Sequence, residues 1–191
     1  METDENQMSD CFSALTEKEK LRLDTIKHPE KRCEFLTSRA LRTELFGRRE
    51  VHYSETGAPF IDNEGFISIS HTHGLVGIAR SADFNIGMDL EYIKEKAVSV
   101  SYRFVHESER QIFDTESAHD MSLLWSFKET LFKLAGKKGI LWATDLIVEK
   151  QGDRFTGKIL NHGKDCQYDL TLTNYKHYLV TCNTTDAILI S

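Results

Sequence analysis

The hydrophobic pattern of this chain switches between helical and strand periods, and this switching constrains the fold more than any other feature. Apolar residues recur at helical spacing, then form short strand-like runs, and then repeat this sequence of patterns. The order of helices, strands, helices and strands predicts an α+β fold. The expected helices cover residues 16–27, 31–46, 107–114 and 120–135. The expected strands are Ile67–His71, Val76–Arg80, Ile86–Glu91, Leu146–Lys150, Arg154–Leu160, Cys166–Leu172 and Tyr178–Asn183.

The same order of elements predicts two similar halves. A chain of 191 residues is long enough for one compact domain or for two small halves that share a core. We expect an N-terminal half over residues 1–94 and a C-terminal half over residues 95–191. The sequence contains no clear internal repeat, so this division depends on the order of the elements alone.

The composition of the chain limits which partners it is expected to bind and in which cellular compartment it is expected to lie. The net charge is −6, which does not suggest bulk nucleic-acid binding. The N-terminus lacks the positive start and apolar run of a secretory signal, and no stretch approaches the ~20 apolar residues of a membrane span. Cysteines without metal or redox spacing suggest reduced thiols. We therefore expect a cytoplasmic protein, and the presence of two halves in one chain favours a monomer. The four cysteines are Cys11, Cys33, Cys166 and Cys182.

One segment departs from the overall acidity. Between Lys27 and Arg49 there are seven Lys or Arg residues and three Glu residues. This local positive charge could receive a phosphate-rich ligand or an acidic protein. A solvated helix face explains the same count, so charge alone leaves both interpretations open.

A first candidate site is the strand segment Ile86–Glu91. On a strand, alternate side chains share a face, so Asp89 and Glu91 point the same way. Their backbones are ~6–7 Å apart at the usual strand rise, and the two carboxylates can converge on one cation. Gly87 on that face is expected to leave space for a bulky ligand. A half-buried strand with a wet acidic face is the alternative.

A second candidate is the helical segment Trp125–Gly136. Its apolar positions Leu124, Phe127, Leu131 and Leu134 form one stripe. Glu129 and Lys133 fall on the other side at i,i+4 spacing, where an ion pair stabilises an exposed helix. A stabilising ion pair explains Glu129 and Lys133, but it does not explain the tryptophan, Trp125, at the edge of the same polar face.

A third candidate is the strand end Ser70–His71. A hydroxyl and an imidazole there could donate to a phosphate. His71 and His73 could instead bind a metal, although no third Cys or His lies at the local spacing of a zinc site. A lone histidine at a strand end is more often structural than catalytic.

Taken in order, these motifs resemble those of the 4′-phosphopantetheinyl transferase superfamily. The series is Ser-His, Gly-x-Asp-x-Glu and Trp-x-x-Lys-Glu-x-x-x-Lys-x-x-Gly, and the last block is the most specific. The segment Lys31–Arg39 and the turn Gly57-x-Pro59 also resemble this family. The likeness runs from about residue 28 to 139 and is nearest to the surfactin-synthetase-activating type. It implies two α+β halves related by a pseudo-twofold, with the active site at their junction.

The resemblance also implies what the protein does. It would transfer 4′-phosphopantetheine from coenzyme A to a serine of an apo acyl or peptidyl carrier protein, with Mg²⁺, releasing adenosine 3′,5′-bisphosphate. Such an enzyme is a holo-[acyl-carrier-protein] synthase. Carrier proteins are commonly acidic, and the basic Lys27–Arg49 segment is one candidate dock.

The resemblance assigns roles to single residues. Asp89, Glu91 and Glu129 would hold Mg²⁺, and Glu129 would also help to deprotonate the serine. Mg²⁺ prefers oxygen ligands, so three carboxylates suit it. Lys133 would neutralise the diphosphate, so that Asp89, Glu129 and Lys133 form the catalytic set. The expected coenzyme A contacts are Arg32, Arg39, Ser70, His71, Lys128 and Lys133.

One departure from the family pattern concerns the phosphate contacts. Many relatives have Gly-Lys-Pro where this chain has Gly57-Ala58-Pro59, so the lysine contact is missing. Two other functions fit the same residues: a Mg²⁺-dependent phosphohydrolase or nuclease that uses water as the nucleophile, and a non-catalytic module that binds coenzyme A or a carrier.

Overall fold

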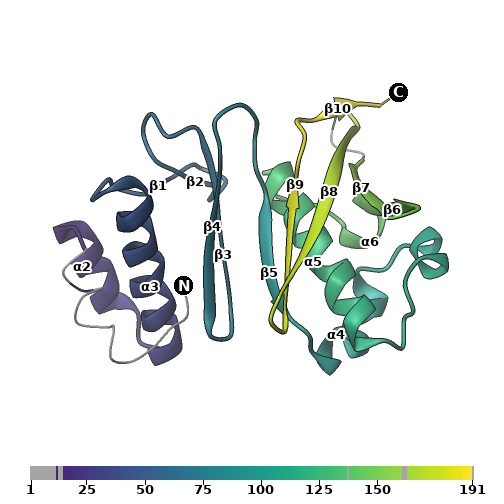
Figure 1. The fold of residues 1–191 in the computed structure, drawn as a ribbon, viewed down its shortest axis with the longest axis horizontal. Coiled ribbons are helices and arrows are strands. Elements are labelled where there is room, and N and C mark those ends of the chain that lie inside the picture. The colour runs from purple at the N-terminus through teal and green to yellow at the C-terminus, as the bar shows by residue number, and fades with distance from the viewer. Residues whose placement is uncertain (1–11, 13–14, 137, 161–162, 191) are drawn as a thin grey trace.

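A computed structural model describes residue 12 and residues 15–136, 138–160 and 163–190 of the chain. In the N-terminal part, helices α2 (Glu17–Thr25) and α3 (Pro29–Phe46) precede the strands β1 (His52–Tyr53), β2 (Pro59–Phe60), β3 (Phe66–Thr72) and β4 (Leu75–Ser81). These strands form an antiparallel sheet in the order β1-β2-β3-β4. Figure 1 shows α2 and α3 on the outer side of this sheet.

The C-terminal part is built around a second antiparallel sheet. It contains β5 (Met88–Tyr92), β6 (Leu146–Gln151), β7 (Arg154–Ile159), β8 (Cys166–Tyr175) and β9 (Tyr178–Asn183). The strand order is β5-β9-β8-β7-β6, and β10 (Ile188–Leu189) pairs with β8. The helical elements are α4 (Glu95–Val100), the 3₁₀ turns η2 (Ser101–Arg103) and η3 (Glu107–Gln111), the long α5 (Ala118–Ala135) and α6 (Trp142–Asp145).

Local sequence signals explain where helix α2 begins and where helix α5 ends. Thr16 caps α2 through a capping box with Glu19, as the spacing of Thr and Glu predicts. Gly136 ends α5 in the left-handed conformation, which glycine adopts without a steric cost. The expected stripe of α5 is buried, and Phe127 and Leu131 have no exposed surface. This stripe packs into the main hydrophobic core against the second sheet.

The α+β class is confirmed, and each expected helix or strand has a counterpart. The expected helix 107–114 is a shorter 3₁₀ turn over Glu107–Gln111. The elements β1, β2, β10, α4 and α6 are too short to show a hydrophobic periodicity in the sequence. No helix among the described residues is long and apolar enough to cross a membrane.

The two sheets meet along strand β5, shortly before the expected division at residues 94 and 95. Strand β5 pairs with β9, so it belongs to the C-terminal sheet. On its other side, β5 meets β3 through side chains: the amides of Met88 and Leu90 donate to the hydroxyls of Ser68 and Ser70, at 3.0 and 3.2 Å. Two serines therefore satisfy the free edge of β5. The division at residues 94 and 95 and the pseudo-twofold relation stay predictions.

Candidate active site

Asp89 is the centre of a buried polar cluster between β3, β5 and α5. Its carboxylate Oδ1 accepts hydrogen bonds from Ser70 Oγ at 2.9 Å and from Lys133 Nζ at 3.0 Å. Its Oδ2 accepts from Ser126 Oγ at 3.0 Å. Asp89 is only 6% exposed, so it is not part of a wet acidic face. The cluster joins both sheets to α5.

Lys133 reaches this cluster from the last turn of α5. Its ammonium group donates to the Met88 carbonyl at 2.7 Å and to Ser70 Oγ at 3.0 Å, besides its ion pair with Asp89. The simple explanation for Lys133, an exposed i,i+4 ion pair with Glu129, is therefore wrong. Lys133 instead brings a positive charge to the buried carboxylate.

Glu129 lies one turn before Lys133 on α5 and has the most strongly shifted carboxyl group of the site. Burial raises the pKa of Glu129 to about 7, with the charge of Asp89 and, less strongly, that of Glu91 adding to the effect, while Lys133 opposes it. No hydrogen bond or ion pair to Glu129 is found within the described part of the chain. A half-buried carboxylate with a pKa near neutrality suits a general base.

Glu91 is the third carboxylate of the group. Burial raises the pKa of Glu91, Lys94 opposes this, and Asp89 adds to it. Lys94 Nζ lies 3.3 Å from Glu91 Oε2. Asp89 and Glu91 are therefore close enough to Glu129 to raise its pKa, which is compatible with the grouping that the family resemblance implies.

The fit of a divalent cation to these carboxylates is partial. Within the described residues, no group of three His, Cys, Asp or Glu side chains is arranged to hold a metal ion. Nevertheless, the carboxylates of Asp89 and Glu91 raise the pKa of Glu129, and a cation would relieve this repulsion. The oxygen donors suit Mg²⁺ in kind. Lys133 already places one positive charge at Asp89.

The two arginines expected to meet phosphates are engaged inside the N-terminal part. Arg32 donates to the carbonyls of Leu23 and Ile26 at 2.5 and 3.2 Å, which caps the C-terminus of α2. Arg39 is 4% exposed and pairs with Glu19 at 2.8 Å. Arg39 also lines a cavity of about 320 Å³ between α3 and β3. Their coenzyme A roles stay predictions, and Arg39 is the one that borders a cavity.

Ser70 and His71 lie on opposite faces of β3, because successive strand residues alternate. Ser70 is buried at the Asp89 cluster. His71 lines the α3–β3 cavity, where its Nε2 lies 3.2 Å from both Glu34 Oε2 and Lys31 Nζ. Burial lowers the pKa of His71, and Glu34 opposes this. The two side chains therefore do not converge on one phosphate in this structure.

Lys128 does not join these groups. It is fully buried, and its Nζ lies 2.8 Å from Glu109 Oε2. It also donates to the carbonyls of Phe104 and Trp142. This burial corrects the expectation of a coenzyme A contact, because the ammonium group has no face open to a ligand.

Glycine is needed at position 87 for a different reason from the one expected. A Cβ at this position would lie 2.5 Å from the Thr130 carbonyl oxygen and 2.9 Å from Leu134 Cγ. Glycine here lets α5 approach β5 closely. It does not leave open space for a ligand.

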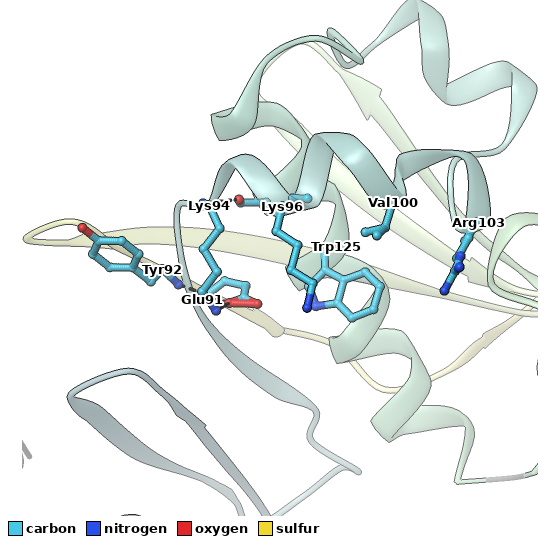
Figure 2. A pocket seen from close by; sticks show the side chains of 9 residues that line it. Glu91, Tyr92, Lys94, Lys96, Val100, Arg103 and Trp125 are labelled. Atoms are coloured by element: carbon cyan, nitrogen blue, oxygen red, sulfur yellow. Dashed lines mark hydrogen bonds and ion pairs between the residues drawn. The ribbon is translucent and has the colours of Figure 1, made fainter. Parts of the chain in front are cut away.

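A pocket of about 330 Å³ adjoins Glu91. Figure 2 shows the Trp125 ring between Glu91 on one side and Val100 and Arg103 on the other. The lining side chains are Glu91, Tyr92, Lys94, Lys96, Ala97, Val100, Arg103, Ser122 and Trp125. The lining therefore combines apolar and aromatic side chains with three basic ones.

Two residues of these sites, Ser126 and Glu34, were not predicted from the sequence. Ser126 lies three residues before Glu129 and seven before Lys133, so helical spacing alone could have put it on their face. Glu34 is at i,i+3 spacing from Lys31 on α3, so that contact is local, but only the folded chain brings Glu34 to His71.

Comparison with known proteins bears directly on this geometry. A family model described as the 4′-phosphopantetheinyl transferase superfamily matches residues 85–182, just over half of the chain. The chain belongs to this superfamily. The family resemblance of the motifs is thereby confirmed, and the matched region of this superfamily member contains Asp89, Glu91, Glu129 and Lys133.

A curated relative within the superfamily supports the same membership. The 4′-phosphopantetheinyl transferase gsp of Aneurinibacillus migulanus is 31% identical over 88 residues, which is 44% of this chain and 37% of the relative. The match thus spans little more than a third of the relative's length. The residues of the α3–β3 cavity lie before the region that the superfamily model matches.

Proposed function

We propose that this superfamily member transfers 4′-phosphopantetheine from coenzyme A to a serine of an apo acyl or peptidyl carrier protein, releasing adenosine 3′,5′-bisphosphate. The observation that carries the proposal is the meeting of Asp89, Lys133 and the near-neutral carboxyl group of Glu129 where α5 crosses β5. A general base beside a positive charge is what attack of a hydroxyl on a diphosphate requires.

The nucleotide end of coenzyme A would occupy the cavity between α3 and β3. Lys31 and His71 line this cavity, and their side chains are about half exposed. Tyr53 and Phe35 offer aromatic surface nearby, and Arg39 stacks on Phe35 at 4.4 Å. A cavity with basic and aromatic side chains suits a phosphorylated nucleoside.

Magnesium is part of this proposal. Asp89, Glu91 and Glu129 would hold it, and Asp89 Oδ2 accepts one hydrogen bond, which leaves a lone pair for a ligand. Bound Mg²⁺ would supply charge neutralisation at the diphosphate. Its positive charge would also favour the ionised form of Glu129 and would offset the repulsion from Asp89.

The chain's own residues account for the proton and charge transfers. Glu129 accepts the proton of the carrier serine, directly or through a water. The serine oxygen then bonds to the phosphorus that carries the pantetheine arm, and the bond from that phosphorus to the bridging oxygen breaks. The bridging oxygen leaves with adenosine 3′,5′-bisphosphate, and the ammonium group of Lys133 neutralises the developing charge.

The carrier protein would dock at the pocket beside Glu91. Lys96 and Arg103 bring positive charge to this pocket, beside Lys94, which pairs with Glu91, and this charge suits an acidic carrier surface. Ala97 and Val100 add apolar contacts. This pocket is a better candidate dock than the Lys27–Arg49 segment because it adjoins the proposed metal ligand Glu91.

Mass spectrometry of an apo-carrier incubated with coenzyme A and Mg²⁺ tests the proposal. A mass gain of one phosphopantetheine group, absent with a chelator, is the expected result. Cleavage of coenzyme A without carrier modification would instead indicate a phosphohydrolase. Binding without either reaction would indicate a non-catalytic module. Both of those outcomes contradict transfer.

A further inference from the structure

The best-buried ion pair near the proposed site lies behind the Glu91 pocket. Glu109 and Lys128 are both fully buried and are 2.8 Å apart. Glu109 also accepts hydrogen bonds from the amides of His106 at 2.7 Å and Val148 at 2.8 Å. The pair therefore ties η3 and β6 to the middle of α5.

The remaining contacts of Lys128 point to a specific task. Its ammonium group binds the carbonyl oxygens of Phe104 and Trp142, the latter at 3.0 Å. The rings of these same two residues enclose Trp125. Phe104 meets Trp125 edge-on at 5.3 Å, and Trp142 stacks on it at 4.6 Å. One cation thus holds the main chain of both residues that pack against this tryptophan.

Trp125 in turn forms a wall of the pocket (Figure 2). It lies three residues before Lys128 on α5, so the two side chains are neighbours on the helix. A flat indole stays in one orientation only while both of its neighbours stay fixed. Burying an ion pair carries a large desolvation cost, and hydrophobic side chains of similar volume often stabilise a fold as well. An apolar side chain in place of Lys128 could not bind the carbonyl oxygens of Phe104 and Trp142, so it could not hold them in this arrangement.

We propose that Glu109 and Lys128 are positioning residues that hold Trp125 in the wall of the Glu91 pocket and thereby set the affinity for the carrier protein. This inference rests on the proposed function, because it takes the pocket as the carrier dock. It differs from the expectation for Lys128, in which the lysine contacts coenzyme A. The two roles predict opposite effects on the two substrates.

Lys128→Met separates them, since methionine keeps most of the volume and removes the charge. We expect the KM for an apo acyl carrier protein to rise on the order of tenfold, as for the loss of a well-packed aromatic contact. The dissociation constant for coenzyme A should change less than twofold. The near-ultraviolet circular dichroism of the stacked Trp125–Trp142 pair should be lost, while the far-ultraviolet spectrum stays unchanged. These are the only tryptophans of the chain, so the signal is specific.

Two further variants test the same positioning role. Ile61→Ala removes a buried side chain from a separate cluster in the N-terminal part, and it should lower stability without changing the carrier KM or the tryptophan signal. If Lys128→Met does not fold, Phe104→Leu keeps the ion pair, removes the ring that meets Trp125 edge-on, and should raise the carrier KM in the same direction. An unchanged carrier KM in Phe104→Leu would then overturn the proposal.

Other outcomes overturn the inference directly. Weakened coenzyme A binding with an unchanged carrier KM in Lys128→Met would show a ligand contact instead. An unchanged tryptophan signal would remove the positioning role. If the unaltered protein modifies no carrier, the proposed function fails on its own, and carrier binding followed by tryptophan fluorescence still decides whether Lys128 positions this pocket.

Discussion

Lys133 on α5 is joined to Asp89 on β5 by an ion pair of 3.0 Å, and this pair crosses the junction between the long helix and the second sheet. The Asp89 side chain is 8% exposed and that of Lys133 is 26% exposed, so the pair is largely shielded from water. Any cation that binds Asp89 must therefore share this carboxylate with Lys133. A divalent ion and a lysine around one diphosphate would divide the task of neutralising it.

Asp89→Ala should abolish transfer. It removes a proposed metal ligand and leaves Lys133, Ser70 and Ser126 without their shared acceptor. Mass spectrometry of the apo-carrier measures the loss, and thermal unfolding shows whether the variant is folded. Chelator-treated wild-type protein should be equally inactive. Transfer at full rate by the chelated protein would contradict the metal role.

Gly87→Ala should destabilise the protein by ~1–3 kcal/mol, as overpacking of a close contact usually does. The added methyl group would meet the Thr130 carbonyl, which is backbone and cannot rotate away. Denaturant unfolding measures the cost. Gly152→Ala is an instructive comparison, because its added Cβ meets nothing within 4 Å, so its cost comes only from the positive φ of 61°. Unchanged stability in Gly87→Ala would show that α5 moves away freely.

Sequence patterns predicted the long elements because each carries its own periodicity. The stripe of α5 and the alternation in β3 and β5 are local properties, so the buried residues of α5 and the shared face of Asp89 and Glu91 followed from spacing. The pairing of β5 with β9 did not follow, because more than eighty residues separate them. Strand partners at that distance carry no local signal.

The contacts that the sequence did not predict are those whose partner comes from another segment. Lys128 resembles an exposed basic residue until Glu109 from η3 is found against it. Arg39 seems free for a phosphate until α2 brings Glu19 to it. In both cases a buried carboxylate, remote in sequence, forms an ion pair with the basic side chain. The Asp89–Glu129 proximity could be expected only through the family resemblance.

Glu34→Gln should tighten coenzyme A binding about two- to fivefold, which is the scale of a partly exposed charge interaction. Glu34 holds both Lys31 and His71, at 2.8 and 3.2 Å, and its negative charge opposes a phosphate at that place. Calorimetric titration with coenzyme A and with its 3′-dephospho form measures the effect. A gain confined to coenzyme A would assign this corner to the 3′-phosphate. Weaker binding would mean that Glu34 orients the side chains of Lys31 and His71 instead.

Stability of the metal-free protein should fall as the pH rises from about 4.5 to about 7. The pKa of the Glu129 carboxyl rises on folding from its ordinary value of 4.5 to about 7, so the native state holds the extra proton in this window. Thermal unfolding in chelator across this range measures the fall, with Glu129→Gln as the control that should flatten it. Added Mg²⁺ should restore stability above pH 7. A wild-type profile identical to that of Glu129→Gln would show that Glu129 titrates normally.

Glu129→Gln is also the sharpest test of the mechanism. Glutamine keeps the length and one oxygen ligand of Glu129 but removes its charge and its basicity. Asp89, Glu91 and the phosphate oxygens would still bind Mg²⁺, so coenzyme A should bind with nearly unchanged affinity. The chemical step should fall by ~10²–10⁴-fold, which is the usual contribution of a positioned general base. Single-turnover transfer and coenzyme A affinity, measured in the same variant, give both numbers.

The combinations of these two measurements separate the possible roles of Glu129. Near-normal transfer would remove Glu129 from the mechanism. Loss of both transfer and coenzyme A binding would leave it as a metal ligand, with the base still to be identified. The pH profile adds an independent check: if Glu129 is the base, wild-type transfer depends on a group that must lose its proton, and the variant loses that dependence. A slow variant that keeps the wild-type profile would point to another base, because the titrating group would then lie elsewhere.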